Sequence, residues 1–379
     1  MNTNDSVALP SGFIRLVWSN LAAQSAEQIG LAAAPIVAVL ALGAGVGATG
    51  LLQTAQTLAF VLFAIPAGLL ADRTSRRLVM TGAEALRVLS LLGILVLAYV
   101  GWLTLPLLAA LGFVGACGTV AYSVAAPALA GGLVAWTGGA PAFGVAAALS
   151  TCAVFLLAGL REPTRTAGAK RGAFREIREG AGFVFGHRLL LPVFVTQFVF
   201  NAAFFTLQAV YVPYAIQQLG FSATAVGVTL ATYGVGMIAG ALAAARITRA
   251  LPFGQVIVLG PIAGLVAALL MLLTIWTPSP WLAASSFFLI GAGPIVWVIS
   301  TATLRQTVTP RALLGRVSAI NITAYGARPL GAALGALVGV LYGAEMCLVV
   351  AALGFLVQAV VIVASPVRRL VHQPEMADD

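Results

Sequence analysis

Charged side chains are scarce in this sequence. Only 8% of its 379 residues are Asp, Glu, Lys or Arg, whereas soluble domains carry roughly 25%. Apolar residues make up 61%, and the mean hydropathy is +1.04. Runs of about 20 apolar residues recur, the length that an α-helix needs to cross the hydrocarbon core of a bilayer. The composition therefore predicts an all-α polytopic membrane protein in contact with the lipid bilayer.

Strand-like alternation and the motifs of metal or nucleotide chemistry are also missing. The apolar runs are continuous, which excludes a transmembrane barrel, whose strands alternate. Cys117, Cys152 and Cys347 lie singly in apolar runs, and the two histidines lie in polar segments, so neither a metal site nor a disulfide framework is indicated. The sequence has no Gly-x-x-x-x-Gly-Lys phosphate loop. We expect no enzyme activity and no cofactor.

The distribution of Arg and Lys predicts the topology. The net charge is +9, and the basic residues fall in every second segment between the apolar runs. Under the positive-inside rule these segments are cytoplasmic. We expect both termini in the cytoplasm, a location in the inner or plasma membrane, and no nucleic-acid partner. Residues 1–12 lack a basic region, so no cleavable leader is expected.

Eleven apolar spans are long enough to be membrane helices, five before residue 161 and six after residue 188. Their approximate limits are 14–41, 46–70, 78–100, 103–125, 141–160, 189–212, 222–245, 255–275, 281–303, 316–342 and 344–365. In the linker between the two sets, apolar residues alternate with Arg and Glu. We expect an amphipathic helix on the cytoplasmic surface with its apolar side toward the membrane. A solvated connector is the alternative.

The ten residues GLLADRTSRR, from Gly68 to Arg77, carry four charges between two apolar runs, so they form a short loop outside the hydrocarbon. Their pattern resembles the loop between helices two and three of the major facilitator superfamily of transporters. It is carried by Gly68, Asp72, Arg73, Arg76 and Arg77. Ser75 stands where that family usually has Gly. In that family the Asp of this loop helps to hold the cytoplasmic side closed.

The second half of the chain echoes this loop. Gly240 to Arg249 keeps the Gly, the Leu and the basic end, although Ala244 replaces the Asp. The resemblance implies the two-bundle fold of that superfamily, nominally twelve helices in two repeats. We expect an N-terminal bundle at 1–160, a cytoplasmic linker at 161–188 and a six-helix C-terminal bundle at 189–379.

The first half is short for that fold. Residues 126–138 look like the end of a fifth helix without its beginning. The chain must cross from the outer side near residue 101 to the cytoplasm by residue 161, either in three cramped crossings or in one crossing with a distorted hairpin. A middle crossing of about 15 residues reaches only about 22 Å, less than the roughly 30 Å core. We expect three crossings, with the fifth helix truncated by a deletion around helices four and five.

Four short segments narrow the resemblance to the enterobactin-exporter and macrolide-efflux branch. They are Ser25-Ala-Glu27, Glu84-Ala-Leu-Arg87, Leu314-Gly-Arg316-Val and Pro329-Leu-Gly331. That branch implies export of a small amphipathic molecule such as a drug or siderophore, by proton antiport, in a monomer. The family often has an Arg in helix four that is linked to proton coupling, and 103–125 has none. Two alternatives stay open: an importer or uniporter of a small solute, and a non-transporting degenerate membrane protein.

Two ionisable residues lie deep within predicted spans. Such groups are costly in hydrocarbon and usually face a water-filled cavity. We expect Glu27 to carry protons or to meet substrate, with a structural hydrogen bond as the alternative. Arg328 is expected to meet an anionic substrate group or to pair with Glu27 across the cavity, with snorkelling as the alternative.

Polar residues at helical spacing complete the candidate site. Asn20 and Gln24 precede Glu27 in the first span, and the polar residues of the 189–212 span share one face. Lining of a cavity and interhelical hydrogen bonding are both open for them. The expected lining residues are Asn20, Gln24, Gln53, Gln56, Gln197, Asn201, Gln208 and Tyr211. Glu84 and Arg87 are expected to pair as i,i+3 neighbours near the cytoplasmic end of their helix, as part of the gate.

The topology can be tested with a single cysteine at Thr166, in a background without the three native cysteines. A membrane-impermeant thiol reagent should label it only after the inner face of the membrane has been exposed. Labelling in intact cells would contradict the predicted orientation.

Overall fold

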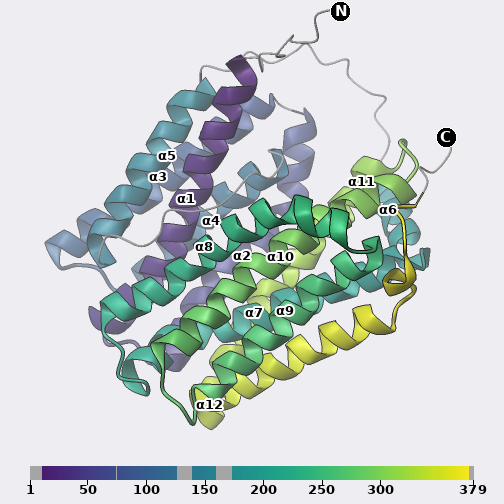
Figure 1. The fold of residues 1–379 in the computed structure, drawn as a ribbon. Helices are drawn as coiled ribbons and strands as arrows, with labels where there is room; N and C mark the ends of the chain where they lie inside the picture. Colours follow the sequence, from purple (N-terminus) through teal and green to yellow (C-terminus); the bar gives the residue numbers. More distant parts are fainter. Residues whose placement is uncertain (1–10, 74, 126–138, 159–172, 375–379) are drawn as a thin grey trace, which may run out of the picture.

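The structure, a computed structural model, describes residues 11–73, 75–125, 139–158 and 173–374, and every regular element in these ranges is helical (Figure 1). The elements are α1 (Ser11–Leu40), α2 (Val46–Arg73), α3 (Arg76–Val100), α4 (Leu105–Ala125), α5 (Gly139–Ala158), α6 (Ala173–Gly186), α7 (Leu190–Gln217), α8 (Ala223–Ala250), α9 (Phe253–Leu273), α10 (Pro280–Val308), α11 (Leu314–Thr323), the 3-10 turn η1 (Ala324–Gly326), α12 (Ala327–Ala364) and η2 (Pro366–Arg369). The predicted all-α fold is confirmed. The truncated helix predicted at 126–138 lies outside the described residues.

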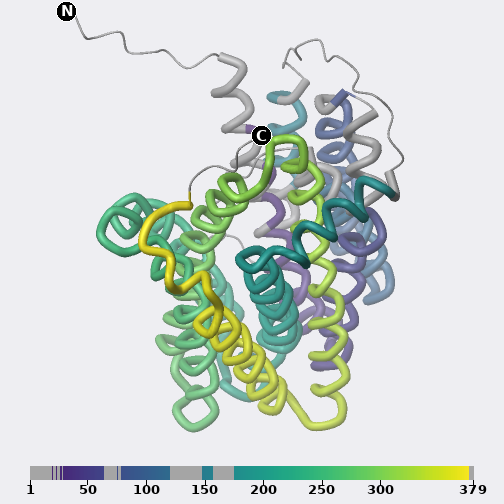
Figure 2. Tube along the Cα trace, turned by 90° about the vertical axis from the view of Figure 1, so that its right-hand side faces the viewer, coloured from purple at the N-terminus to yellow at the C-terminus, as the bar shows by residue number. Residues whose placement is uncertain are grey.

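Caps and glycines determine where several helices end. The Ser75 hydroxyl accepts a hydrogen bond from the Leu78 N–H (3.3 Å) and caps α3, which gives a serine a role at this loop position. Gly343 has φ 85°, a backbone conformation that favours glycine, and it divides α12 at the predicted break. Figure 2 shows the two parts of α12 running in opposite directions from this turn. The predicted span 316–342 is itself interrupted, by η1.

The helices form two groups that meet along α2. Helices α1, α3, α4 and α5 pack together with α2, whereas α7, α8, α9, α10 and α12 form the second group (Figure 1). The turns that follow α1, α3, α7 and α9, and the turn at Gly343, lie at one end of the bundle. Their described residues include no Arg or Lys, so we call this the arginine-free end. The arginine end is the opposite one, with α6, α11 and η2.

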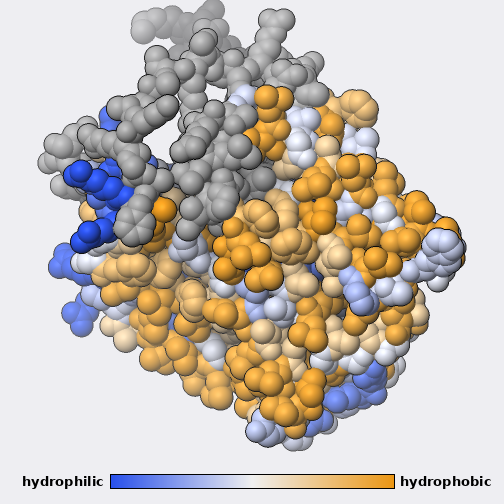
Figure 3. All heavy atoms as spheres, turned by 180° about the vertical axis from the view of Figure 1, so that it is seen from behind, coloured by the Kyte–Doolittle hydropathy of each residue, from blue (hydrophilic) through white to orange (hydrophobic). Residues whose placement is uncertain are grey.

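The outer surface matches a membrane environment. Seven of the described helices are long and apolar enough to cross a bilayer, counting Leu314–Ala364 as one. Apolar side chains cover much of the face seen in Figure 3. Trp102, Trp276 and Trp281 are 72%, 71% and 82% exposed at the arginine-free end. Exposed tryptophans are typical of the interface between hydrocarbon and water.

The predicted linker helix is present as α6, and part of its apolar side packs against α11 and α7. Val184 packs with Val317 and Ile320 of α11 and with Leu190 of α7. Glu179 forms an ion pair with Arg316 of α11. The amphipathic pattern located the helix correctly. Phe185 on its apolar side is 49% exposed, and the orientation of this side toward the membrane stays a prediction.

Small residues let α12 approach α7 and α2 closely. A Cβ added at Gly331 would lie 2.0 Å from the Ala202 carbonyl oxygen of α7, and the Thr206 hydroxyl donates to the Gly331 carbonyl (2.9 Å). Toward the arginine-free end, a Cβ on Gly50 of α2 would lie 2.6 Å from Ala336. Small residues at such contacts are typical of tightly packed membrane helices. The two groups of helices are therefore in tight contact at the arginine-free end.

Gly331→Ala tests this packing. The added methyl group meets backbone atoms of α7, and overpacking costs about 1–3 kcal/mol, so we expect a lower melting temperature in detergent. Gly82→Ala is the control, because nothing lies within 4 Å of its added Cβ. Equal melting temperatures for the two variants would contradict the close α7–α12 contact.

Candidate functional site

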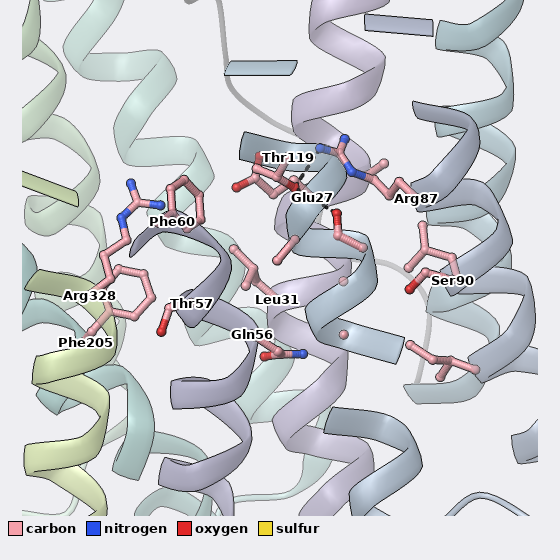
Figure 4. A pocket seen from close by; sticks show the side chains of 17 residues that line it. Glu27, Leu31, Gln56, Thr57, Phe60, Arg87, Ser90, Thr119, Phe205 and Arg328 are labelled. Atoms are coloured by element: carbon pink, nitrogen blue, oxygen red, sulfur yellow. Dashed lines mark hydrogen bonds between the residues drawn. The ribbon is translucent and has the colours of Figure 1, made fainter. Parts of the chain in front are cut away.

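A cavity of about 70 Å³ lies where the two groups of helices face each other (Figure 4). Its walls come from α1, α2, α3 and α4 on one side and from α7 and α12 on the other. The polar and aromatic lining residues are Glu27, Gln56, Thr57, Phe60, Arg87, Ser90, Thr119, Phe205 and Arg328. Glu27 and Arg328, which lie far apart in the sequence, thus line one cavity.

Glu84 and Arg87 form the expected ion pair, at 2.8 Å between Arg87 Nη1 and Glu84 Oε1. The side chains are 0% and 4% exposed, so the pair is buried. Arg87 also donates to the Ala23 carbonyl of α1 (2.9 Å) and to the Thr119 hydroxyl of α4 (2.7 Å). One guanidinium therefore connects α1, α3 and α4. Arg87, which was expected to be part of the cytoplasmic gate, lines the cavity.

Glu27 lies on α1, one helical turn after Ala23, and its carboxyl group faces the cavity (Figure 4). It is half-buried. Within the described part of the chain it forms no ion pair with Arg87, Arg328 or any other residue. The carboxylate therefore has free capacity to accept a hydrogen bond or to bind a proton.

Arg328 lies on α12 at the other side of the cavity (Figure 4). Its Nε–H donates to Asn201 Oδ1 (3.1 Å), and Asn201 is oriented by its own bond to the Gln197 carbonyl (2.8 Å). The guanidinium carbon lies 4.4 Å from the Phe60 ring centroid and 4.3 Å from that of Tyr325. Cation–π contacts stabilise the charge, yet no carboxylate among the described residues pairs with it.

The other predicted lining residues are distributed unevenly. Gln56 lines the cavity, whereas Gln53 is buried without reaching it. Tyr211 is buried in the core of the second group, where its hydroxyl bonds Thr229 and its ring meets Phe287 edge-on at 4.6 Å. Gln197 and Gln208 are half-buried on α7 and are not among the lining residues.

For seven of the predicted site residues the structure describes only the backbone. They are Asn20, Gln24, Gly68, Asp72, Arg73, Arg76 and Arg77. The backbone shows only that α2 ends at Arg73 and that α3 begins at Arg76.

The aromatic part of the site was not predicted from the sequence. Phe60, Phe205 and Tyr325 surround Arg328 at centroid distances of 4.4, 5.3 and 4.3 Å. One signal was available, since Phe60 follows Gln53 and Gln56 at steps that keep all three on one helix face. In the described ranges, no three His, Cys, Asp or Glu side chains gather as a metal site would need.

Arg87→Gln tests the buried pair. It leaves the Glu84 carboxylate buried without its cation, and removing one partner of a buried ion pair costs about 3–5 kcal/mol. We expect a clear fall in melting temperature and substantial recovery in the neutral double variant Glu84→Gln, Arg87→Gln. Arg175→Gln is the control, because the Arg175–Glu179 pair lies on the surface. A double variant that melts at the same temperature as Arg87→Gln would contradict the assignment of Glu84 and Arg87 as a buried ion pair.

Comparisons with known proteins agree with this architecture. Residues 107–336, more than half of the chain, match the family described as Major Facilitator Superfamily, and residues 10–126 match the family described as Transmembrane secretion effector. No curated protein matches the chain.

Solved transporters share the fold. The nucleoside transporter NupG is 13% identical, with a TM-score of 0.67 over 94% of this chain and 99% of its own. A bacterial homologue of the human lysosomal transporter Spinster, in an inward-facing conformation, is 14% identical, with a TM-score of 0.61 over 98% and 100%. A D-xylose–proton symporter is 15% identical, with a TM-score of 0.65 over 92% and 96%. The extended family match, the helical architecture and the cavity between two helix groups identify this chain as a member of the major facilitator superfamily.

Proposed function

We propose that this transporter exports a small amphipathic molecule from the cytoplasm by proton antiport, working as a monomer in the inner or plasma membrane. One observation carries the proposal: Glu27 is a carboxylate in the cavity between the two helix groups, and it has no ion-pair partner among the residues that the structure describes. A single group that binds either a proton or a substrate can exchange one for the other. The match to the secretion-effector family over residues 10–126 supports the outward direction.

Alternating access follows from the packing if the arginine end and both termini are cytoplasmic, as the positive-inside rule predicts. The close contacts of α2 with α12 then lie at the outer end, and the cavity belongs to an inward-facing conformation. Its volume of about 70 Å³ is below the roughly 300–1,000 Å³ of ligand sites, so a substrate must widen it. In this proposal the bundles 1–160 and 189–379 rock about the cavity, and the Asp72 loop latches the cytoplasmic side.

Proton-coupled import is the second candidate. A D-xylose–proton symporter shares the fold, and a carboxylate in the cavity suits either direction of coupling. Everted vesicles distinguish the two, because an antiporter accumulates substrate when the lumen is acidic and a symporter does not.

Glu27→Gln keeps the shape of the side chain and removes its titratable proton. After an efflux screen in a pump-deficient host has provided a substrate, its uptake driven by a pH gradient into everted vesicles should fall at least about fivefold, the scale of a typical coupling free energy. Membrane insertion should be unchanged. Glu345→Gln, at the exposed arginine-free end, is the control. Undiminished pH-driven uptake by Glu27→Gln would refute the role of this carboxylate.

A further inference from the structure

The cavity contains two unpaired charges of opposite sign. Glu27 and Arg328 both line it, and neither forms an ion pair with any residue that the structure describes. The third charged residue of the lining, Arg87, is neutralised by Glu84 at 2.8 Å. With Glu27 ionised, the cavity is therefore neutral overall but divided into an acidic side and a basic side.

The basic side has unused donors. A guanidinium has five N–H groups, and the Nε–H of Arg328 is the one that bonds Asn201. The other N–H groups have no acceptor among the residues described. A carboxylate matches this edge of a guanidinium with two parallel hydrogen bonds. Phe60, Phe205 and Tyr325 restrict the faces of the guanidinium and offer apolar surface to whatever binds beside it.

The acidic side has unused acceptors. Glu27 receives no hydrogen bond from the described residues. The nearby Arg87 is occupied by Glu84, by the Ala23 carbonyl and by Thr119, so it does not serve Glu27 in this conformation. An ammonium group supplies the missing donors and the opposite charge.

We propose that the substrate is a zwitterion, an amphipathic molecule whose ammonium group binds Glu27 and whose carboxylate binds Arg328, with an aromatic body against Phe60 and Phe205. This rests on the proposed function, because it takes the cavity as the transport site. A zwitterion satisfies both charges, whereas a singly charged ligand leaves one buried charge without a partner, which is unfavourable in low dielectric. The ammonium and the proton then compete for Glu27, which couples substrate binding to proton release.

Three related probes test the proposal by isothermal titration calorimetry on purified protein in detergent. They are 4-(aminomethyl)benzoic acid, its methyl ester, which keeps only the cation, and its N-acetyl derivative, which keeps only the anion. The zwitterion should bind most tightly to the wild type. Arg328→Gln should weaken the zwitterion and the N-acetyl compound by about tenfold or more and spare the ester.

Glu27→Gln should show the reverse selectivity, weakening the zwitterion and the ester and sparing the N-acetyl compound. Arg328→Lys keeps the positive charge, so it should retain the preference for ligands with a carboxylate. This variant is the control that the fold tolerates a substitution at position 328. Arg249→Gln and Glu345→Gln, both exposed and away from the cavity, should bind all three probes as the wild type does.

Two outcomes would overturn the proposal. One is that the zwitterion fails to bind the wild type more tightly than both derivatives. The other is that each cavity variant weakens all three probes equally, which would mean that these side chains only hold the helices in place. The proposed function can fail separately. If the two cavity variants show opposite ligand selectivity but the protein carries out no pH-driven transport, antiport is refuted and the zwitterion site stands. If the protein transports other amphipathic molecules in response to pH but the variants do not show opposite selectivity, the zwitterion site alone is refuted.

Discussion

A charge buried in an apolar helix bundle is stable only beside a partner, and this constraint organises the interior of the protein. Glu84 and Arg87 meet it by pairing, and Arg87 extends the pair to α1 and α4. Arg328 meets it in part through aromatic rings and Asn201. Glu27, half-buried at the cavity, has no hydrogen-bond or ion-pair partner among the described residues, and we propose that a proton or a ligand supplies one.

The packing of α12 links this charge arrangement to movement. Gly331 lies three residues after Arg328 and touches the backbone of α7, while Ala336 meets Gly50 of α2. A shift of α12 along α2 therefore moves Arg328 relative to Glu27. In the proposed transport cycle the α2–α12 contact at the arginine-free end opens for access from that side, and Arg328 moves with α12. In this way the same helix sets both the shape and the electrostatics of the site.

Most of the fold could be predicted from the sequence because apolar length alone determines which segments cross a membrane. The break at Gly343 and the Glu84–Arg87 pair were also accessible, since both are local. Two kinds of feature were not. An amphipathic pattern does not identify what covers its apolar side, so the packing of α6 on α11 could not be predicted. The aromatic residues around Arg328 come from α2, α7 and η1, and apolar rings are unremarkable within apolar spans until the fold brings them together.

The central claim is that Glu27 exchanges a proton for a ligand, and proton release on binding tests it most directly. Purified protein in weakly buffered detergent solution, with a pH-indicator dye, is titrated with 4-(aminomethyl)benzoic acid at successively lower pH values until proton release reaches its maximum. We expect release of about one proton per molecule bound in the wild type and none in Glu27→Gln. Saturating binding to the wild type without proton release, or equal release from both proteins, would contradict it.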